Sequence, residues 1–108
     1  MYELFQSEKT EKFHFRLKAG NGEIILQSQG YQDKSGCLNG IDSVTKNGSD
    51  ESNFEKKEAT NGKFYFVLKA GNGQIIGQSQ QYKSESGRNN GIASVGKNCG
   101  GGTKDLTA

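Results

Sequence analysis

The fold is decided by the stretch Phe64-Tyr65-Phe66-Val67-Leu68-Lys69-Ala70-Gly71-Asn72-Gly73-Gln74-Ile75-Ile76, because the chain contains it twice. Its near copy begins at Phe13 and ends at Ile25. Residues 13–47 match residues 64–98 without a gap, at an offset of 51 positions, and 23 of these 35 positions are identical. Such a match indicates internal duplication. We therefore expect one domain, residues 1–108, with a first repeat over about 1–52 and a second over about 53–108.

Each copy begins with the pattern of a strand that buries one face. Apolar residues alternate with mostly polar ones at a period of two, which is typical of such a strand. The inward set is Phe13, Phe15, Leu17 and Ala19 in the first copy and Phe64, Phe66, Leu68 and Ala70 in the second. The outward set is His14, Arg16 and Lys18, against Tyr65, Val67 and Lys69. The copies thus share the buried face and differ on the outer one.

A tight turn follows each strand. Asn21-Gly22, like its counterpart in the second copy, tolerates the positive φ that a two-residue type I′ hairpin requires. Such a turn places Leu17 opposite Leu26 and turns Ile25 outward, whereas a three-residue loop with a bulge reverses these faces. We favour the two-residue turn in the first repeat. The turn type of the second repeat stays open, because Gly77 stands where the first repeat has Leu26.

The period then changes to that of a helix. In the first repeat, Leu38, Ile41, Val44 and Thr45 recur at helical spacing. Asp33 and Ser84 are the candidate N-caps, and Asn47-Gly48 is a plausible stop. Glycines inside these segments cost about 1 kcal/mol each relative to alanine. The matched Gly40 and Gly91 suggest helices that lie close on a sheet, with broken helices as the alternative.

The remaining segments predict two more strands. We expect one at about residues 53–58, after a polar loop, and a last short one in the tail beyond the glycines at 100–102. Two copies are too few to close a propeller, so a fused pseudo-dimer is the architecture that the repeat favours.

The doubled pattern F-x-F-x-L-K-A-x-N-G, then I-I, Q-S-Q-x-Y and N-G-I-x-S-V-x-K-N, resembles the YegP-like proteins, a bacterial family of unknown function. The resemblance covers nearly the whole chain. It implies an α+β fold in which two β-β-β-α-β repeats form one pseudo-twofold sheet, with exchanged last strands and two helices packed on one face. It brings no catalytic residue with it.

Charge and composition exclude several classes of protein. Fourteen basic and 12 acidic residues leave a net charge of +2, with the two signs interspersed, so no basic stripe marks a dedicated nucleic-acid protein. No apolar run approaches the roughly 20 residues of a membrane span, and the polar start lacks the features of a leader. We expect a soluble, cytoplasmic chain. Cys37 and Cys99 occupy non-equivalent places in the two repeats, so we expect two reduced thiols.

No stretch carries a catalytic signature. Gly20-Asn21-Gly22 precedes another strand, so it indicates a hairpin rather than a phosphate loop, which opens a helix. His14 is the single histidine and has no acidic or cysteine partner at ligand spacing. One histidine cannot serve two triads built on the repeated Ser28 and Ser79. We therefore expect no catalytic residue, no metal site, no cofactor and no enzyme activity.

The outward sheet face is the best candidate for function. Cationic and aromatic groups together can hold phosphates and stack bases, so the sharpest hypothesis is a binding or accessory protein with weak affinity for nucleic acid. The candidate binding residues are Arg16, Lys18, Tyr65 and Lys69. The alternative is a structural or protein-interaction module that adds a partner's strand to a sheet edge. The expected partner is nucleic acid or another protein, with no membrane, and the chain is expected to be a monomer. The repeated Q-S-Q segments line a polar groove or merely finish a strand.

Overall fold

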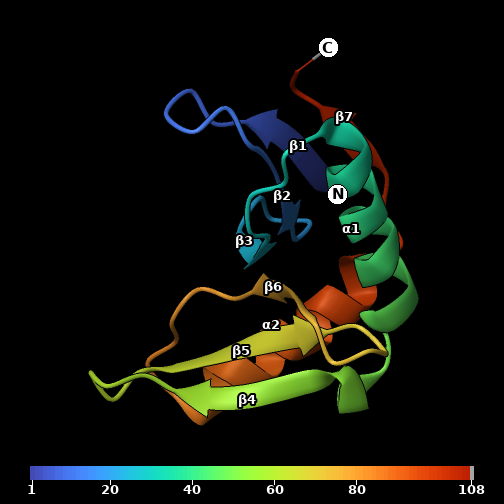
Figure 1. Ribbon diagram of the computed structural model, residues 1–108. Helices are drawn as coiled ribbons and strands as arrows, with labels where there is room; N and C mark the ends of the chain where they lie inside the picture. Colours follow the sequence, from blue (N-terminus) through green and yellow to red (C-terminus); the bar gives the residue numbers. More distant parts are fainter. Residues whose placement is uncertain (108) are drawn as a thin grey trace.

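The computed structural model describes residues 1–107, which form one mixed seven-stranded sheet and two long helices on one of its faces (Figure 1). The strand order is β4-β5-β6-β3-β2-β1-β7. The elements in chain order are β1 (Tyr2–Gln6), β2 (Phe13–Lys18), β3 (Ile24–Gln27), α1 (Lys34–Asn47), the 3-10 helix η1 (Glu51–Asn53), β4 (Phe54–Glu58), β5 (Phe64–Lys69), β6 (Ile75–Gln78), α2 (Glu85–Asn98) and β7 (Thr103–Asp105). The α+β class, the single sheet and the two helices are confirmed.

The two repeats meet in the middle of the sheet. Three antiparallel strands of each repeat stand on either side of the boundary between β3 and β6, which is joined by the single residue pair Gln27 and Gln78. The last strand, β7, returns from the second repeat and pairs in parallel with β1 of the first. In the first repeat the corresponding positions belong to η1 and the start of β4. Only the second repeat therefore passes its last strand, β7, to the other repeat among the described residues. Strand β4 forms the opposite edge of the sheet.

The predicted two-residue turn is wrong. Gly22, at a φ of +86°, closes a three-residue loop in which its N–H donates to the carbonyl of Ala19 at 2.9 Å. A bulge then follows, since Leu17 pairs with Leu26 but Lys18 pairs with Ile24. The bulge restores the expected pairing of Leu17 with Leu26 and turns Ile25 inward, where only 3% of it is exposed.

The second repeat shows the same loop and bulge. Gly73 has a φ of +83°, and the register shifts between Leu68 and Lys69. Ile76, whose facing the sequence left open, is 8% exposed and belongs to the core. Gly77 then lies beside the first repeat, and a Cβ built on it would stand 2.7 Å from Cγ of Leu26. The leucine thus fills the space that the glycine leaves at the boundary between the repeats.

Both helices begin where expected. The side chain of Asp33 accepts a hydrogen bond from the N–H of Gly36 at 2.7 Å, and Ser84 caps α2 through Gly87 at 3.0 Å. Each helix runs unbroken for 14 residues. Neither is long and apolar enough to cross a membrane, in the part of the chain that the structure describes.

The matched glycines explain how these helices approach the sheet. A Cβ on Gly40 would stand 2.9 Å from Cε2 of Phe15 and would collide with the hydroxyl of Tyr31. Gly91 lies in the same way against the ring of Phe66, at 3.1 Å. The prediction of a close helix-to-sheet contact is confirmed at both positions.

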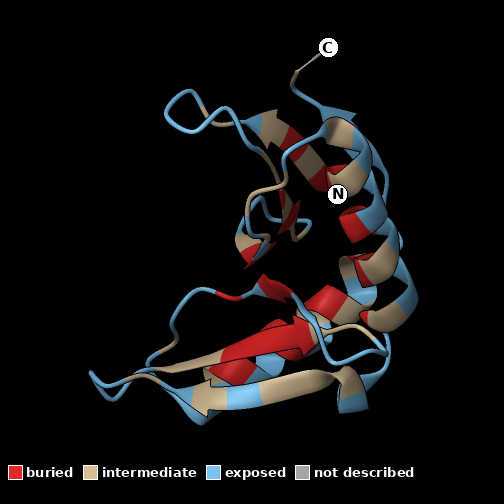
Figure 2. Cartoon of the chain, viewed as in Figure 1, coloured by how far each residue is buried: buried red, intermediate tan, exposed pale blue. Residues whose placement is uncertain are grey.

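One core joins the two repeats between the sheet and the helices. Figure 2 shows buried residues in the central strands and along the side of the helices that faces the sheet. Both cysteines are free and buried, in agreement with the expected thiols. The completely buried aromatic and leucine side chains of this core are Tyr2, Leu4, Phe15, Leu17, Leu26, Phe66 and Leu68.

Candidate functional site

The candidate site is the sheet face opposite the helices. Helix α1 contacts β2, β5 and β6, and α2 contacts β2, β3 and β5, so both lie over the same face and share one core (Figure 1). Within residues 1–107 no helix covers the other side. The pairing registers align one row of outward residues across that face, and the row is Lys104, Glu3, Arg16, Gln27, Gln78, Val67 and Glu55.

In the first repeat, a glutamate holds the two predicted cations. Nε of Arg16 lies 2.7 Å from Oε1 of Glu3, and Nζ of Lys18 lies 3.3 Å from the same oxygen. The hydrogen bond from Arg16 is the main cause that lowers the pKa of Glu3. The Arg16 guanidinium also lies 4.6 Å from the ring centre of Phe5, which stacks on His14 at 5.5 Å.

The second repeat has a related arrangement. Nζ of Lys69 lies 2.5 Å from Oε2 of Glu55, and Lys57 approaches the other oxygen of this carboxylate at 3.5 Å. The bond from Lys69 is the main cause that lowers the pKa of Glu55. Tyr65 pairs across the strands with Lys57 and is half-buried. Val67 stands where the first repeat has Arg16, and it is only 2% exposed although it faces outward.

The structure therefore brings all four predicted residues onto one face, in two groups. Arg16 and Lys18 lie on one side of the repeat boundary, and Tyr65 and Lys69 lie on the other. Each group shares its cations with one carboxylate. Among the charged strand residues of this face, five are cationic and two acidic, and these are Arg16, Lys18, Lys57, Lys69 and Lys104 against Glu3 and Glu55.

Sequence reasoning missed Lys57, Lys104 and the two glutamates. The facing of Lys104 depends on the pairing of β7 with β1, which joins opposite ends of the chain. The glutamates had a signal that could have been used. Glu3 and Glu55 correspond in the lead-ins of the two repeats, as Lys18 and Lys69 do in the strands that follow. A duplicated acid next to a duplicated base indicates a cross-strand ion pair.

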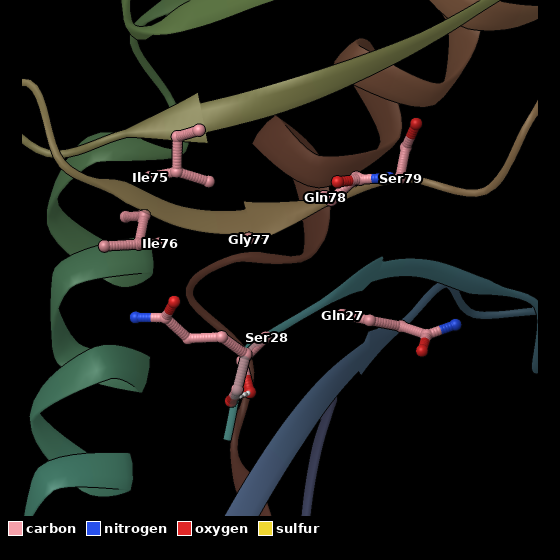
Figure 3. A pocket seen from close by; sticks show the side chains of 8 residues that line it. Gln27, Ser28, Ile75, Ile76, Gly77, Gln78 and Ser79 are labelled. Carbon is pink, nitrogen blue, oxygen red and sulfur yellow. Dashed lines mark hydrogen bonds between the residues drawn. The ribbon is translucent and has the colours of Figure 1, made fainter. Parts of the chain in front are cut away.

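A groove opens in the middle of the sheet, where β3 and β6 diverge beyond their one residue pair. It has a volume of about 510 Å³. Figure 3 shows the side chains that line it. Gln80 takes no part in it and instead donates a hydrogen bond to Glu23 at 2.9 Å. Of the two alternatives left open for the Q-S-Q segments, the groove applies to three of the four glutamines. Its lining is Gln27, Ser28, Gln29, Ile75, Ile76, Gly77, Gln78 and Ser79.

The repeated serines are committed to the backbone. The hydroxyl of Ser28 accepts a bond from the N–H of Phe15 at 2.9 Å and donates to the carbonyl of Gln29 at 2.8 Å. Ser79 makes the equivalent bonds with Phe66 and Gln80, at 3.0 and 2.7 Å. These hydroxyls fasten the ends of β3 and β6 to the neighbouring strands, as strand-end residues are expected to do.

Two other titratable side chains, those of Cys37 and Tyr2, are buried in the core. Within the described residues, no three His, Cys, Asp or Glu side chains gather as metal ligands would. Burial raises the pKa of Cys37 to about 11, which keeps this thiol protonated at neutral pH. Burial likewise raises the pKa of Tyr2 to about 12, and its hydroxyl donates to the carbonyl of Cys99 at 2.7 Å.

Comparison with known proteins gives a consistent result. Residues 8–55 and 59–105 each match the family described as Domain of unknown function (DUF1508). A UPF0339 protein of Shewanella oneidensis is 53% identical over 107 residues, which are 98% of this chain and 96% of that one. The UPF0339 protein YegP of Escherichia coli K12 is 53% identical over 97 residues, or 90% and 87% of the two chains.

Two solved structures share the fold. The solution NMR structure of a UPF0339 protein from Shewanella oneidensis has a TM-score of 0.90 at 52% identity, covering 97% of this chain and 89% of that one. The solution NMR structure of the yegP protein of Escherichia coli, described as a protein of unknown function, has a TM-score of 0.91 at 50% identity, covering 97% and 90%. The resemblance seen in the sequence motifs is confirmed.

Proposed function

This chain belongs to the DUF1508 family, which has no assigned function, and from that premise we propose that it is a non-enzymatic binding protein whose ligand lies across the open face of the sheet. The ligand that suits this face best is a single-stranded nucleic acid. The observation that carries the proposal is the combination of five cationic side chains with aromatic rings on a face that no described helix covers.

Each group has a role in such binding. Arg16, Lys18 and Lys69 hold phosphates, while the ring of Tyr65 offers a surface on which a base stacks. The stacked Phe5 and His14 give the first repeat an aromatic surface of its own. The groove between the two groups presents glutamine amides, which can donate and accept hydrogen bonds at base edges.

The two glutamates set the strength of this binding. A phosphate must compete with Glu3 for Arg16 and with Glu55 for Lys69. The protein as a whole has a net charge of only +2. Both facts favour weak binding. The binding should also depend strongly on salt, because counterion release supplies most of its free energy.

The test is a titration of fluorescein-labelled single-stranded RNA and DNA 12-mers at low salt. We expect amide shifts in β2 and β5, and binding that weakens as salt rises. The double variant Arg16→Gln/Lys69→Gln should reduce the slope of log K against log[salt] by about 0.7 for each lost contact. The matched control, Lys46→Gln/Lys97→Gln, removes the same charge from the two helices. Shifts confined to the helices, or equal losses in both variants, would refute the proposal.

A second candidate function is that of a protein-interaction module. The observation that favours it is the position of β4 at the edge of the sheet, with no strand beside its outer side among residues 1–107. An edge strand offers unpaired N–H and carbonyl groups to an extended segment of another protein. Pairing at β4 is independent of the open face, since it uses backbone groups in the plane of the sheet.

A further inference from the structure

The two edges of the sheet are built differently, although the repeats are related. At one edge, β7 runs parallel to β1, and Leu106 donates its N–H to the carbonyl of Leu4 at 2.8 Å. The opposite edge is β4, where Lys56 stands in the place of Leu4. No strand of residues 1–107 lies beside it. The pairing of β7 with β1 therefore serves as a model for the direction and position of a strand added beside β4.

The strand at the first edge brings a carboxylate to a helix. Oδ2 of Asp105 accepts a bond from Nζ of Lys34, the first residue of α1, at 2.9 Å. One turn along the same helix lies Cys37, which is completely buried. The charge of Asp105 contributes, after burial, to the raised pKa of this thiol, so Asp105 lies near both residues. Lys34 and Cys37 are three positions apart and share a helix face.

The second helix has a cation on the corresponding face, but no strand of residues 1–107 brings a carboxylate to it from beyond β4. Glu85 stands where α1 has Lys34, and Arg88 stands where it has Cys37, so the positive charge is moved one turn along the same face. Only 8% of Arg88 is exposed. Its NH1 donates to the carbonyl of Lys57 in β4 at 3.3 Å, and its guanidinium lies 5.2 Å from the ring centre of Phe64.

The bonding of Arg88 is incomplete. Its Nε has no hydrogen-bond partner, and no carboxylate of residues 1–107 lies within ion-pair distance of it. A buried charge without a counter-charge is unfavourable, and a carboxylate is the partner that a guanidinium binds best. The missing group is of the kind that β7 supplies at the other edge through Asp105.

We propose that the free edge of β4 accepts, in parallel, an extended segment of a partner protein, and that an aspartate or glutamate of this segment binds Arg88. The inference rests on the second candidate function, strand addition at β4, and adds the direction and the chemistry of the partner. Charge complementarity favours a carboxylate at this point of the segment, because Arg88 bonds to the backbone of Lys57 and the preceding residue, Lys56, lies on the helix-facing side of β4. The same charges disfavour apolar strands and a second copy of β4.

The test uses the full chain labelled with ¹⁵N and two synthetic peptides. One peptide copies residues 100–107, Gly-Gly-Gly-Thr-Lys-Asp-Leu-Thr, and the other replaces its aspartate by asparagine. We expect the aspartate peptide to shift the amides of Lys56 and its neighbours in β4. The asparagine peptide should bind about tenfold more weakly, since a hydrogen bond between charged groups is lost. Shifts at Leu4 without shifts in β4 would overturn the proposal, because the peptide would then have replaced β7 at the other edge.

The variant Arg88→Met separates recognition from folding. Methionine removes the unpaired charge at similar volume, so we expect the melting temperature to stay or to rise. The two peptides should then bind alike, at the affinity of the asparagine peptide. The control Lys97→Met, farther along α2, should leave the preference for the aspartate peptide unchanged.

Each outcome decides a different point. Equal shifts of β4 by both peptides would leave strand addition standing and overturn the role of Arg88. A lower melting temperature of Arg88→Met with an unchanged preference for aspartate would show that Arg88 is structural only. Absence of any shift in β4, measured with the unaltered chain, would overturn strand addition and this inference together.

Discussion

At the scale of single residues, the duplicated glycines of the helices have two different roles. Gly40 and Gly91 bring each helix against an aromatic pair on the sheet, and a side chain there would meet Phe15 or Phe66. Gly36 and Gly87 lie in the first helical turn, where an added Cβ makes nearly ordinary contacts, the shortest being 3.1 Å and 3.4 Å to the capping side chains. Only the first pair is required by packing.

This difference predicts opposite effects of the same substitution within α2. Gly91→Ala should destabilise the protein by about 1 to 3 kcal/mol, because the methyl group overpacks the contact with Tyr82 and Phe66. Gly87→Ala should stabilise it by up to about 1 kcal/mol, because alanine favours the helix and its Cβ would make only ordinary contacts with Ser84 and Tyr82. Urea unfolding of the two variants measures both changes. Equal destabilisation by both would mean that the helix cannot tolerate any side chain on this face.

At the scale of elements, the sequence predicts best what depends on neighbours along the chain. The alternation in β2 and β5 and the caps at Asp33 and Ser84 were read correctly, because period and capping are local properties. The hairpin turn was not. Asn-Gly suits both a two-residue turn and the last two positions of a three-residue loop. In the structure, the Asn21 side chain accepts the N–H of Glu23 at 3.0 Å and stabilises the longer loop.

The candidate site follows the same rule. The alternation placed Arg16, Lys18, Tyr65 and Lys69 on the outer face correctly, because their strands are self-evident from the sequence. The alternation could not predict that Lys104 faces outward or that β4 has a free edge. Both depend on which strand the tail selects, and that choice joins residues about a hundred positions apart.

The docking of β7 should depend on acid pH. Hydrogen bonds from Thr107 and then from Lys34 lower the pKa of Asp105 to about 2, below the value of about 3.9 expected for an unfolded aspartate. The bonds from Thr107 are local to the tail, whereas the bond from Lys34 of α1 joins the tail to the rest of the fold. The contribution of this ion pair to docking is therefore complete above about pH 4 and is lost as the pH falls toward 2.

The heteronuclear NOE of the Leu106 amide, followed from pH 5 to pH 2, measures this release because that amide bonds to β1. We expect the value to fall toward that of a mobile tail as the pH is lowered. In Asp105→Asn it should be low and independent of pH over this range. A fall at the same pH in both proteins would assign the release to other groups.

At the scale of the whole molecule, one core contains residues of both repeats, so we expect them to unfold together. Leu26 of the first repeat lies in the space above Gly77 of the second, so the two positions should be coupled. Gly77→Ala should destabilise the protein by about 1 to 3 kcal/mol. Gly77→Ala should destabilise the Leu26→Ala variant less than the unaltered chain, because the shorter side chain leaves space for the added methyl group. A double-mutant cycle measures this coupling, and additive effects would show that the repeats do not share a packed boundary.

The last prediction is that the chain is a monomer, because the duplication already supplies both halves of the sheet. One core contains residues of both repeats, and the radius of gyration of 13.2 Å is that of a compact domain of about this length. The free edge β4 resists self-association, since Lys56 and Glu58 place charges on the side that faces the helices. Sedimentation equilibrium should give 11.7 kDa at micromolar concentration. A stable dimer would contradict this. If the charges are the cause, Lys56→Val/Glu58→Val should associate under the same conditions while the unaltered chain does not.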